Sequence, residues 1–310
     1  PGKPLTSYKT NLPAENIEAI IKTLRFSLNP AFSQQQRLKV YQQAYNWLIK
    51  PIETDLAANN IQTLAFVLDG SLRNIPMAAL YDGKQYLVEK YSLALSPGLQ
   101  LMQARQLKGD TLNVIAAGLS EARQGFKALP GVKSEVKEIS SQVKSTLLVN
   151  EKFTDQNLAK SIKNTPFSVL HLATHGQFSS NSEDTFILTW DGKINVKQLS
   201  EFLRFRDVSD SEPVELMVLS ACQTAKGDKR AILGLAGVAV RSGARSTLAT
   251  LWAVKDESTS KFMVEFYKQF NKPGISKAEA LRQTQITFLK DKSLQHPFFW
   301  APFILVGNWI

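Results

Sequence analysis

The sequence predicts an α/β fold in which helices cover both faces of a mainly parallel sheet. From residue 112 onward, short apolar segments of strand length alternate with longer segments of helical periodicity. Two of the short segments, 169–173 and 216–219, are rich in Val, Leu and Met, as are strands that are buried on both faces. A chain of 310 residues with 44% hydrophobic residues is long enough to bury such a sheet.

Two amphipathic helices are expected in the first fifty residues. Residues 14–28 and 33–50 carry apolar side chains at the spacing of one helical face. Pro30 and Pro51 follow these segments and end the two helices. Both helices are expected to serve as packing elements.

A strand is expected at 62–68, and a hairpin after it. Asp82-Gly83 stands between two apolar segments, which predicts a turn followed by a strand at 86–91. Ser96-Pro97-Gly98 then predicts the start of a helix that ends near residue 107. Lys108-Gly109-Asp110 is a plausible boundary, so we expect a first domain at 1–108 and a second at 109–310.

The second domain alternates strands and helices, which predicts a parallel sheet whose ligands bind beyond the carboxyl ends of its strands. Thr154 is expected to cap a helix, Gly243 to close one, and Ser276 to form a capping box with Glu279. The expected strands are 112–117, 146–149, 169–173, 216–219, 245–251 and 302–306, with a hairpin at 186–192. The expected helices are 133–143, 154–163, 196–202, 233–242, 258–270 and 276–290.

Composition excludes several classes of protein. Lys and Arg outnumber Asp and Glu by 37 to 27, but no run of five basic residues occurs, so we expect a solvated basic surface and no nucleic-acid partner. The single cysteine excludes an intrachain disulfide and suits the reducing cytoplasm. No apolar run approaches 18 residues, so no contact with a membrane is expected. The first residues show no signal peptide and look like a cut start, so we expect the C-terminal part of a longer protein.

His175 and Cys222 each follow an apolar segment, at the carboxyl end of an expected strand. Cys222 is the only cysteine of the chain and lies 47 residues after His175. A single cysteine with a histidine about 50 residues upstream is the spacing of caspase-type nucleophiles. A thiol with a pKa near 8.5 needs a base to become a thiolate, and His175 can be that base. We therefore expect a cysteine peptidase with these two residues as its catalytic dyad and with no cofactor or metal.

Gly176 and Asp256 complete the candidate site. The backbone N–H groups of Gly176 and Cys222 can hold an oxyanion, and a glycine lets the substrate carbonyl come close. Asp256 follows the expected strand 245–251, where its carboxylate can pair with a basic side chain of the substrate. Alternatively, Asp256 caps the helix that begins near Ser258, and both roles can hold.

Alternatively, Cys222 is a buried core thiol with a purely structural role. The polar neighbours Ser220, Gln223 and Thr224 disfavour this alternative. No G-x-S-x-G segment supports a serine nucleophile. The remaining histidines are expected to have structural roles.

His171 and His175 would be about 13 Å apart on a strand, which is too far to share a zinc ion. We therefore expect His171 to support the sheet beneath the site through a hydrogen bond. His296 precedes Pro297 in an aromatic segment and is expected to pack.

Several segments, in order, resemble the CHAT family of caspase-like peptidases, which are related to separase. They cover most of the chain from about residue 60. The segments are 66–76 (FVLDGSLRNIP), 128–132 (ALPGV), 171–176 (HLATHG), 219–224 (LSACQT), 234–237 (GLAG), 243–254 (GARSTLATLWAV), 276–282 (SKAEALR) and 300–307 (WAPFILVG).

The resemblance implies a caspase-haemoglobinase fold, a three-layer sandwich in which a pseudo-protease half precedes the active half. It implies a catalytic role for His175 and Cys222. The segment LWAVKD is similar to the separase stretch whose Asp holds a P1 Arg, which implies that role for Asp256. Members of the family are mostly bacterial, commonly latent, and often fused to tetratricopeptide repeats. No repeat of about 34 residues occurs here, so a sensor module is expected outside this sequence.

The sequence therefore predicts a cytoplasmic cysteine endopeptidase that cleaves protein substrates, after Arg or Lys, and stays latent until a partner or sensor domain acts. The rival hypothesis is a catalytically silent scaffold of the same fold that acts by binding proteins. The presence of both His175 and Cys222 favours the peptidase.

Overall fold

The computed structural model describes residues 5–29, 31–96, 98, 112–178, 184–207, 213–220, 222–224 and 243–310. An eight-stranded sheet with the order β1-β2-β12-β11-β9-β5-β3-β4 forms its centre, and a second sheet has the order β10-β6-β7-β8. The strands of the large sheet are β1 (Thr63–Phe66), β2 (Ser92–Leu95), β3 (Asn113–Gly118), β4 (Lys144–Val149), β5 (Val169–Ala173), β9 (Leu216–Leu219), β11 (Ser246–Thr250) and β12 (Phe303–Gly307). Those of the small sheet are β6 (Gly176–Phe178), β7 (Phe186–Leu188), β8 (Lys193–Asn195) and β10 (Cys222–Thr224).

The large sheet is mainly parallel, as the sequence predicts. Among the described residues, every strand pair in it is parallel except β11 with β12. Strands β1, β2 and β12 therefore point opposite to the other five. The sheet is continuous across the two predicted domains, because β2 pairs with β12 near the C-terminus. The proposed boundary near residue 108 falls outside the described residues, and the two-domain division stays a prediction.

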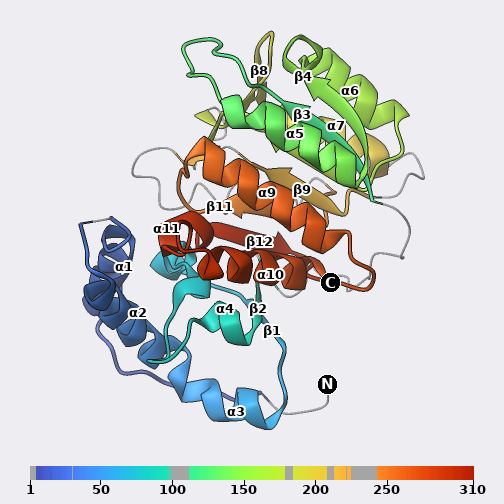
Figure 1. The fold of residues 1–310 in the computed structure, drawn as a ribbon. Coiled ribbons are helices and arrows are strands. Elements are labelled where there is room, and N and C mark those ends of the chain that lie inside the picture. Colours follow the sequence, from blue (N-terminus) through green and yellow to red (C-terminus); the bar gives the residue numbers. More distant parts are fainter. Residues whose placement is uncertain are drawn as a thin grey trace.

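Helices cover both faces of the large sheet, which makes three layers. Alternate residues of β3 show the two faces: Val114 and Ala116 join one hydrophobic cluster, and Ile115 and Ala117 join the other. Helices α5, α9 and α10 lie side by side on the first face, whereas α6 and α7 pack on the second (Figure 1). The helices are α1 (Ala14–Phe26), α2 (Gln34–Leu48), α3 (Glu53–Ala58), α4 (Leu87–Lys90), α5 (Pro130–Gln142), α6 (Asp155–Asn164), α7 (Val196–Asp207), α9 (Asp256–Phe270), α10 (Lys277–Lys290) and α11 (Pro297–Trp300).

Local sequence signals explain most helix boundaries. Ser33 and Gln36 form a capping box at the start of α2, and the Thr154 hydroxyl accepts a hydrogen bond from Asn157 N–H at the start of α6. Ser276 likewise caps α10 by accepting from Glu279 N–H. The reciprocal half of that predicted box is replaced, because the Glu279 carboxylate instead accepts hydrogen bonds from Ser92 and Arg282.

The predicted strand at 86–91 is wrong. A bridge between Tyr81 and Tyr86 closes the expected turn, but the chain then forms α4, and the strand follows at 92–95. The Glu89 carboxylate accepts a hydrogen bond from Tyr86 N–H at 2.6 Å, which favours a helical turn.

Other elements are missing from the sequence prediction or cannot be compared with it. The short strands β6 and β10 are present in the structure but were not predicted. The helices expected at 96–107 and 233–242 fall outside the described residues. Within the described part of the chain, no helix is long and apolar enough to cross a membrane.

A buried ion cluster joins the starts of β9, β11 and α10. Glu215 pairs with Arg245 at 3.0 Å, and the fully buried ammonium of Lys277 lies 3.6 Å from the other oxygen of Glu215. Burial lowers the pKa of Lys277 to about 8, and the Glu215 charge opposes this shift only in part. The cluster therefore contains a lysine whose charged form the fold disfavours.

Lys277→Met is expected to change the pH dependence of stability. Between about pH 8 and the ordinary lysine pKa of 10.5, the unfolded wild type binds more protons than the folded one. The free energy of unfolding should therefore rise with pH in that window, relative to the variant. Urea unfolding from pH 7.5 to 10.5 measures the difference, and Lys197→Met, at an exposed position of α7, is the control. A difference that stays constant with pH would contradict the burial of a titrating amine.

Candidate active site

The candidate site lies at the carboxyl ends of the neighbouring parallel strands β5 and β9. These strands pair in parallel, with His171 opposite Val218 and Leu172 opposite Leu219. Beyond their ends the chain continues into β6 and β10, which also pair in parallel, with Cys222 opposite Gly176. The structure therefore brings the backbone of the sole cysteine beside the residue that follows His175. The described part of Cys222 is its backbone; its side chain lies outside the description.

His175 is almost buried, with 9% of its surface exposed, and its imidazole has defined partners. Nε2 lies 2.7 Å from the carbonyl oxygen of Lys127, and the ring packs against Phe126 at 5.1 Å between centroids. A carbonyl only accepts, so Nε2 carries the proton. In the neutral imidazole, Nδ1 is then the nitrogen with a free electron pair. His175 is thus prepared to act as a base through Nδ1.

The loop 119–129 that provides these partners is fixed against the β7–β8 hairpin. Arg123 and Phe126 exchange backbone hydrogen bonds around Gln124 and Gly125, which both have positive φ, as a tight two-residue turn requires. The Gln124 amide donates to two carbonyls of the β7–β8 turn, and the Arg123 guanidinium stacks 3.3 Å from the Trp190 ring. The carbonyl that orients His175 is therefore held by several independent contacts.

Asp256 is the first residue of α9, and Lys255 holds the N-cap position. The carboxylate nevertheless lies in the first turn, where it favours the helix N-terminus as the alternative interpretation expects. The same carboxylate accepts a hydrogen bond of 2.6 Å from Gly131 N–H, in the first turn of α5. Burial raises the pKa of the Asp256 carboxyl, and the hydrogen bond from Gly131 opposes this. The charge of Glu135 also raises the pKa, and that of His175 lowers it, so Asp256 lies within electrostatic range of both.

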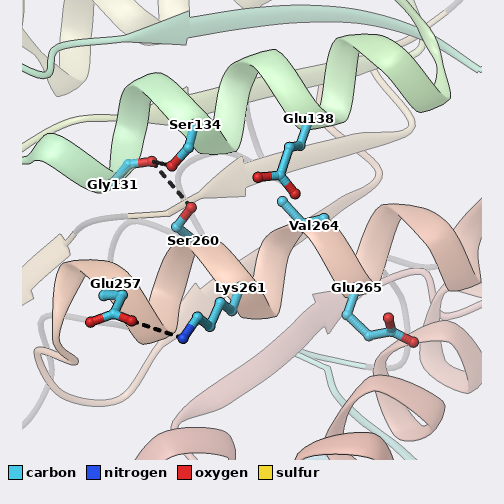
Figure 2. Close-up of a pocket in the computed structure, with 8 residues that line it drawn as sticks. All are labelled: Gly131, Ser134, Glu138, Glu257, Ser260, Lys261, Val264 and Glu265. Atoms are coloured by element: carbon cyan, nitrogen blue, oxygen red, sulfur yellow. Dashed lines mark hydrogen bonds and ion pairs between the residues drawn. The ribbon is translucent and has the colours of Figure 1, made fainter.

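A groove of about 240 Å³ lies between α5 and α9, and Gly131 is one of the residues that line it. Figure 2 shows the Gly131 carbonyl accepting hydrogen bonds from Ser134 and Ser260 at 2.8 and 3.1 Å. Among the residues that the structure describes, His175 is not part of the lining. The described residues that line the groove are Gly131, Ser134, Glu138, Glu257, Ser260, Lys261, Val264 and Glu265.

Beneath the strand ends lies a buried hydrogen-bonded cluster formed by Glu135, His171, Ser220 and Tyr267. His171 Nε2 lies 2.9 Å from Glu135 Oε1, which confirms the expectation that His171 supports the sheet through a hydrogen bond. Glu135 is not among the site residues predicted from the sequence. Its position on the same face of α5 as Val132 and Ile139 is a signal that could have found it.

The other predictions for the site have mixed outcomes. His296 packs against Phe299, as expected, and its Nδ1 also accepts a hydrogen bond from Phe298 N–H. Among the described residues, no three His, Cys, Asp or Glu side chains are grouped as metal ligands would be. Gly176 begins β6 and is buried, and its role toward an oxyanion stays a prediction.

Comparison with known proteins identifies relatives and a shared fold. A family model described as "CHAT domain" matches residues 38–308. Tetratricopeptide repeat protein 28 is 23% identical to the chain, over 318 residues in Homo sapiens and 323 in Mus musculus. Each match covers 85% of this chain and 13% of the relative, so the chain spans about an eighth of the length of the curated relatives it matches.

Two solved structures share the fold over almost all of the chain. The Arg-specific cysteine proteinase gingipain R has a TM-score of 0.53 and 8% identity, over 95% of this chain and 74% of its own. Separase in the Saccharomyces cerevisiae separase–securin complex has a TM-score of 0.52 and 16% identity, over 94% of this chain and 20% of its own. At these identities the likeness concerns the fold, and it confirms the predicted caspase-like three-layer α/β architecture.

Phe126→Ala is expected to make His175 react several-fold faster with diethyl pyrocarbonate, because the substitution removes the ring that covers the imidazole. Peptide mass spectrometry of the folded protein measures the modification at each histidine. His171, which is fully buried elsewhere in the site, is the internal control and should remain unmodified in both proteins. An unchanged rate at His175 would show that the loop 119–129 does not cover it in solution.

Proposed function

The chain belongs to the CHAT domain family, and we propose that it is a cysteine endopeptidase with His175 and Cys222 as its catalytic dyad. The observation that carries the proposal is the parallel pairing of β10 with β6, which puts Cys222 opposite Gly176, directly after His175. The Nε2–H···O bond to Lys127 supports it further, because this bond leaves His175 Nδ1 free to take a proton.

In the proposed reaction, His175 Nδ1 accepts the thiol proton of Cys222, and the thiolate attacks the scissile carbonyl carbon. The carbonyl oxygen becomes an oxyanion, to which the backbone N–H groups of Gly176 and Cys222 donate. His175 then gives its proton to the leaving amine as the C–N bond breaks, which leaves a thioester on Cys222. Water, deprotonated by His175, hydrolyses the thioester and regenerates the thiol.

Lys127 has a role in this scheme through its backbone. The carbonyl oxygen keeps the proton of Nε2 in place through every step, so His175 exchanges protons only at Nδ1. The Phe126 ring keeps water from one face of the imidazole. The orientation of the base thus comes from the loop 119–129.

Asp256 is proposed to bind a basic P1 side chain. Two observations support this: its carboxylate is partly buried, and it is within electrostatic range of His175. A buried carboxylate whose ionisation is unfavourable gains most from a cationic partner, since the ion pair offsets the desolvation. Arg, which bonds carboxylates in a bidentate manner, and Lys are therefore the P1 residues that we propose.

A neighbouring module is proposed to regulate the domain. The curated relatives are named tetratricopeptide repeat proteins, and this chain spans only a small part of them. We propose that the domain works in the cytoplasm beside a tetratricopeptide or other sensor module and is latent until that module or a partner acts.

Cys222→Ala and His175→Ala are each expected to abolish turnover of a fluorogenic peptide library varied at P1, because each removes half of the dyad. Loss of either group costs at least about a thousandfold in such enzymes. Alkylation with iodoacetamide is a second readout that needs no substrate. The chain has one cysteine, so every label reports Cys222.

The wild type should be alkylated faster than a free thiol at pH 6, and His175→Ala should remove the difference. Equal alkylation of the wild type and His175→Ala, together with no turnover, would contradict the peptidase and favour a silent scaffold.

Asp256→Asn is expected to lower kcat/KM for Arg and Lys at P1 by at least tenfold, with little effect on stability, because the amide oxygen can still accept from Gly131 N–H. The raised pKa of Asp256 means that folding disfavours its ionised form. The free energy of unfolding of the wild type should therefore fall, relative to Asp256→Asn, as pH rises through that pKa.

Gly131→Ala is a second test of the role proposed for Asp256. A Cβ at residue 131 would come within 2.8 Å of the Asp256 carboxylate and displace it. Peptide turnover after Arg should decrease in both variants. Unchanged P1 preference in both would contradict the assignment of Asp256 without affecting the dyad.

A further inference from the structure

Glu135 is a carboxylate inside the protein with no Lys or Arg partner among the described residues. Only 1% of its surface is exposed, on the face of α5 that packs against the sheet. Oε1 lies 2.9 Å from His171 Nε2 and 2.5 Å from Ser220 Oγ. Its other polar surroundings come from α9, where Tyr267 hydrogen-bonds His171 and Asp256 lies within electrostatic range. Isolated burial of such a group is costly, so its hydrogen bonds must compensate.

The protons in this cluster can be placed from its chemistry. Burial raises the pKa of Tyr267 well above 10, and the charge of Glu135 acts in the same direction, so the phenol keeps its proton. Its hydroxyl lies 3.2 Å from His171 Nδ1, and in the neutral imidazole, whose Nε2–H faces the Glu135 carboxylate, Nδ1 accepts from it. His171 then carries its own proton on Nε2 and donates it to Glu135. Ser220 donates a second hydrogen bond to Glu135. The Glu135 carboxylate therefore accepts from both His171 and Ser220.

The two donors belong to the two segments that lead to the dyad. His171 is on β5, four residues before His175, and Ser220 follows β9, two residues before Cys222. The side chains of Glu135, His171 and Ser220 are each at most 2% exposed. A single carboxylate oxygen therefore ties the middle of β5 to the residue that follows β9, from the α5 side. The backbone bond from Ser220 N–H to Leu172 O, at 3.0 Å, ties them from within the sheet.

We propose that Glu135 is a positioning residue of the peptidase, which holds the strand ends so that Cys222 meets His175. The inference rests on the proposed function. Charge-assisted hydrogen bonds are the strong and directional ones, so an ionised Glu135 fixes both strand ends more firmly than a neutral amide would. A displacement of about 1 Å between reacting groups can cost about a hundredfold in rate. Glu135 has no contact with the substrate in this scheme and acts on Asp256 only through its charge, so KM should change much less than kcat.

The test compares Glu135→Gln with Glu138→Gln, a matched control one turn further along α5 at an exposed position in the groove of Figure 2. For each folded protein, the rate of alkylation of the sole cysteine is followed with pH. In the wild type the midpoint should lie below the 8.5 of a free thiol. In Glu135→Gln it should move toward 8.5, and kcat should fall about 10- to 100-fold with KM within twofold. Glu138→Gln should match the wild type.

Ser220→Ala keeps the hydrogen bond between Glu135 and His171 and removes only the link to β9, so it should reproduce the effect in smaller degree. It also decides the matter if Glu135→Gln does not fold. A merely structural role would lower the melting temperature and leave the alkylation midpoint and kcat of the folded protein unchanged, which would overturn the inference.

Failure of the proposed function has a different signature. In that case the wild type itself would show the midpoint of a free thiol, and His175→Ala would not change it. A low midpoint that depends on His175 but is the same in wild type, Glu135→Gln and Ser220→Ala would refute the positioning role alone.

Discussion

The parallel pairing of β5 with β9 is the constraint on which the candidate site depends. It places Leu172 opposite Leu219, so both strands end at the same level of the sheet. Their continuations then pair again as β6 and β10. A slip of one residue would turn His171 toward the opposite helical layer and away from Glu135, because strand side chains alternate between faces. The buried apolar residues of both strands specify the register. Burial of these apolar residues therefore also fixes the positions of the candidate site residues beyond the strand ends.

The site is also held from outside the sheet. The loop 119–129 reaches His175 with a backbone carbonyl, and the tight turn at Gln124 and Gly125 lets it dock on the β7–β8 hairpin. Helix α5 follows this loop directly and carries Gly131 and Glu135. One stretch of chain thus contacts the candidate base, the candidate pocket acid and the buried cluster. Its three roles depend on the geometry of a single loop–helix junction.

Sequence reasoning predicted the sheet and the strand ends because their signals are local. The apolar segments before His175 and Cys222 have the length and composition of buried strands. It failed at 86–91, where the side chain of Glu89 caps a helical turn that composition does not indicate. It also missed Lys127, because a backbone carbonyl carries no residue-specific signal. Glu135 was detectable in principle as a charged residue on an apolar helical face, but its partners are remote in sequence and needed the fold.

Helices α5 and α9 connect the electrostatics of the site. Burial raises the pKa of Asp256, and the charge of Glu135 adds to this shift, so the cluster that is proposed to hold the dyad also disfavours ionisation of Asp256. The hydrogen bond from Gly131 N–H and the charge of His175 act in the opposite direction. A cationic P1 side chain would add a third opposing contribution and favour the carboxylate. In the peptidase proposed here, arrival of a basic substrate would therefore complete the charge balance beside His175, which links P1 recognition to the base that performs the chemistry.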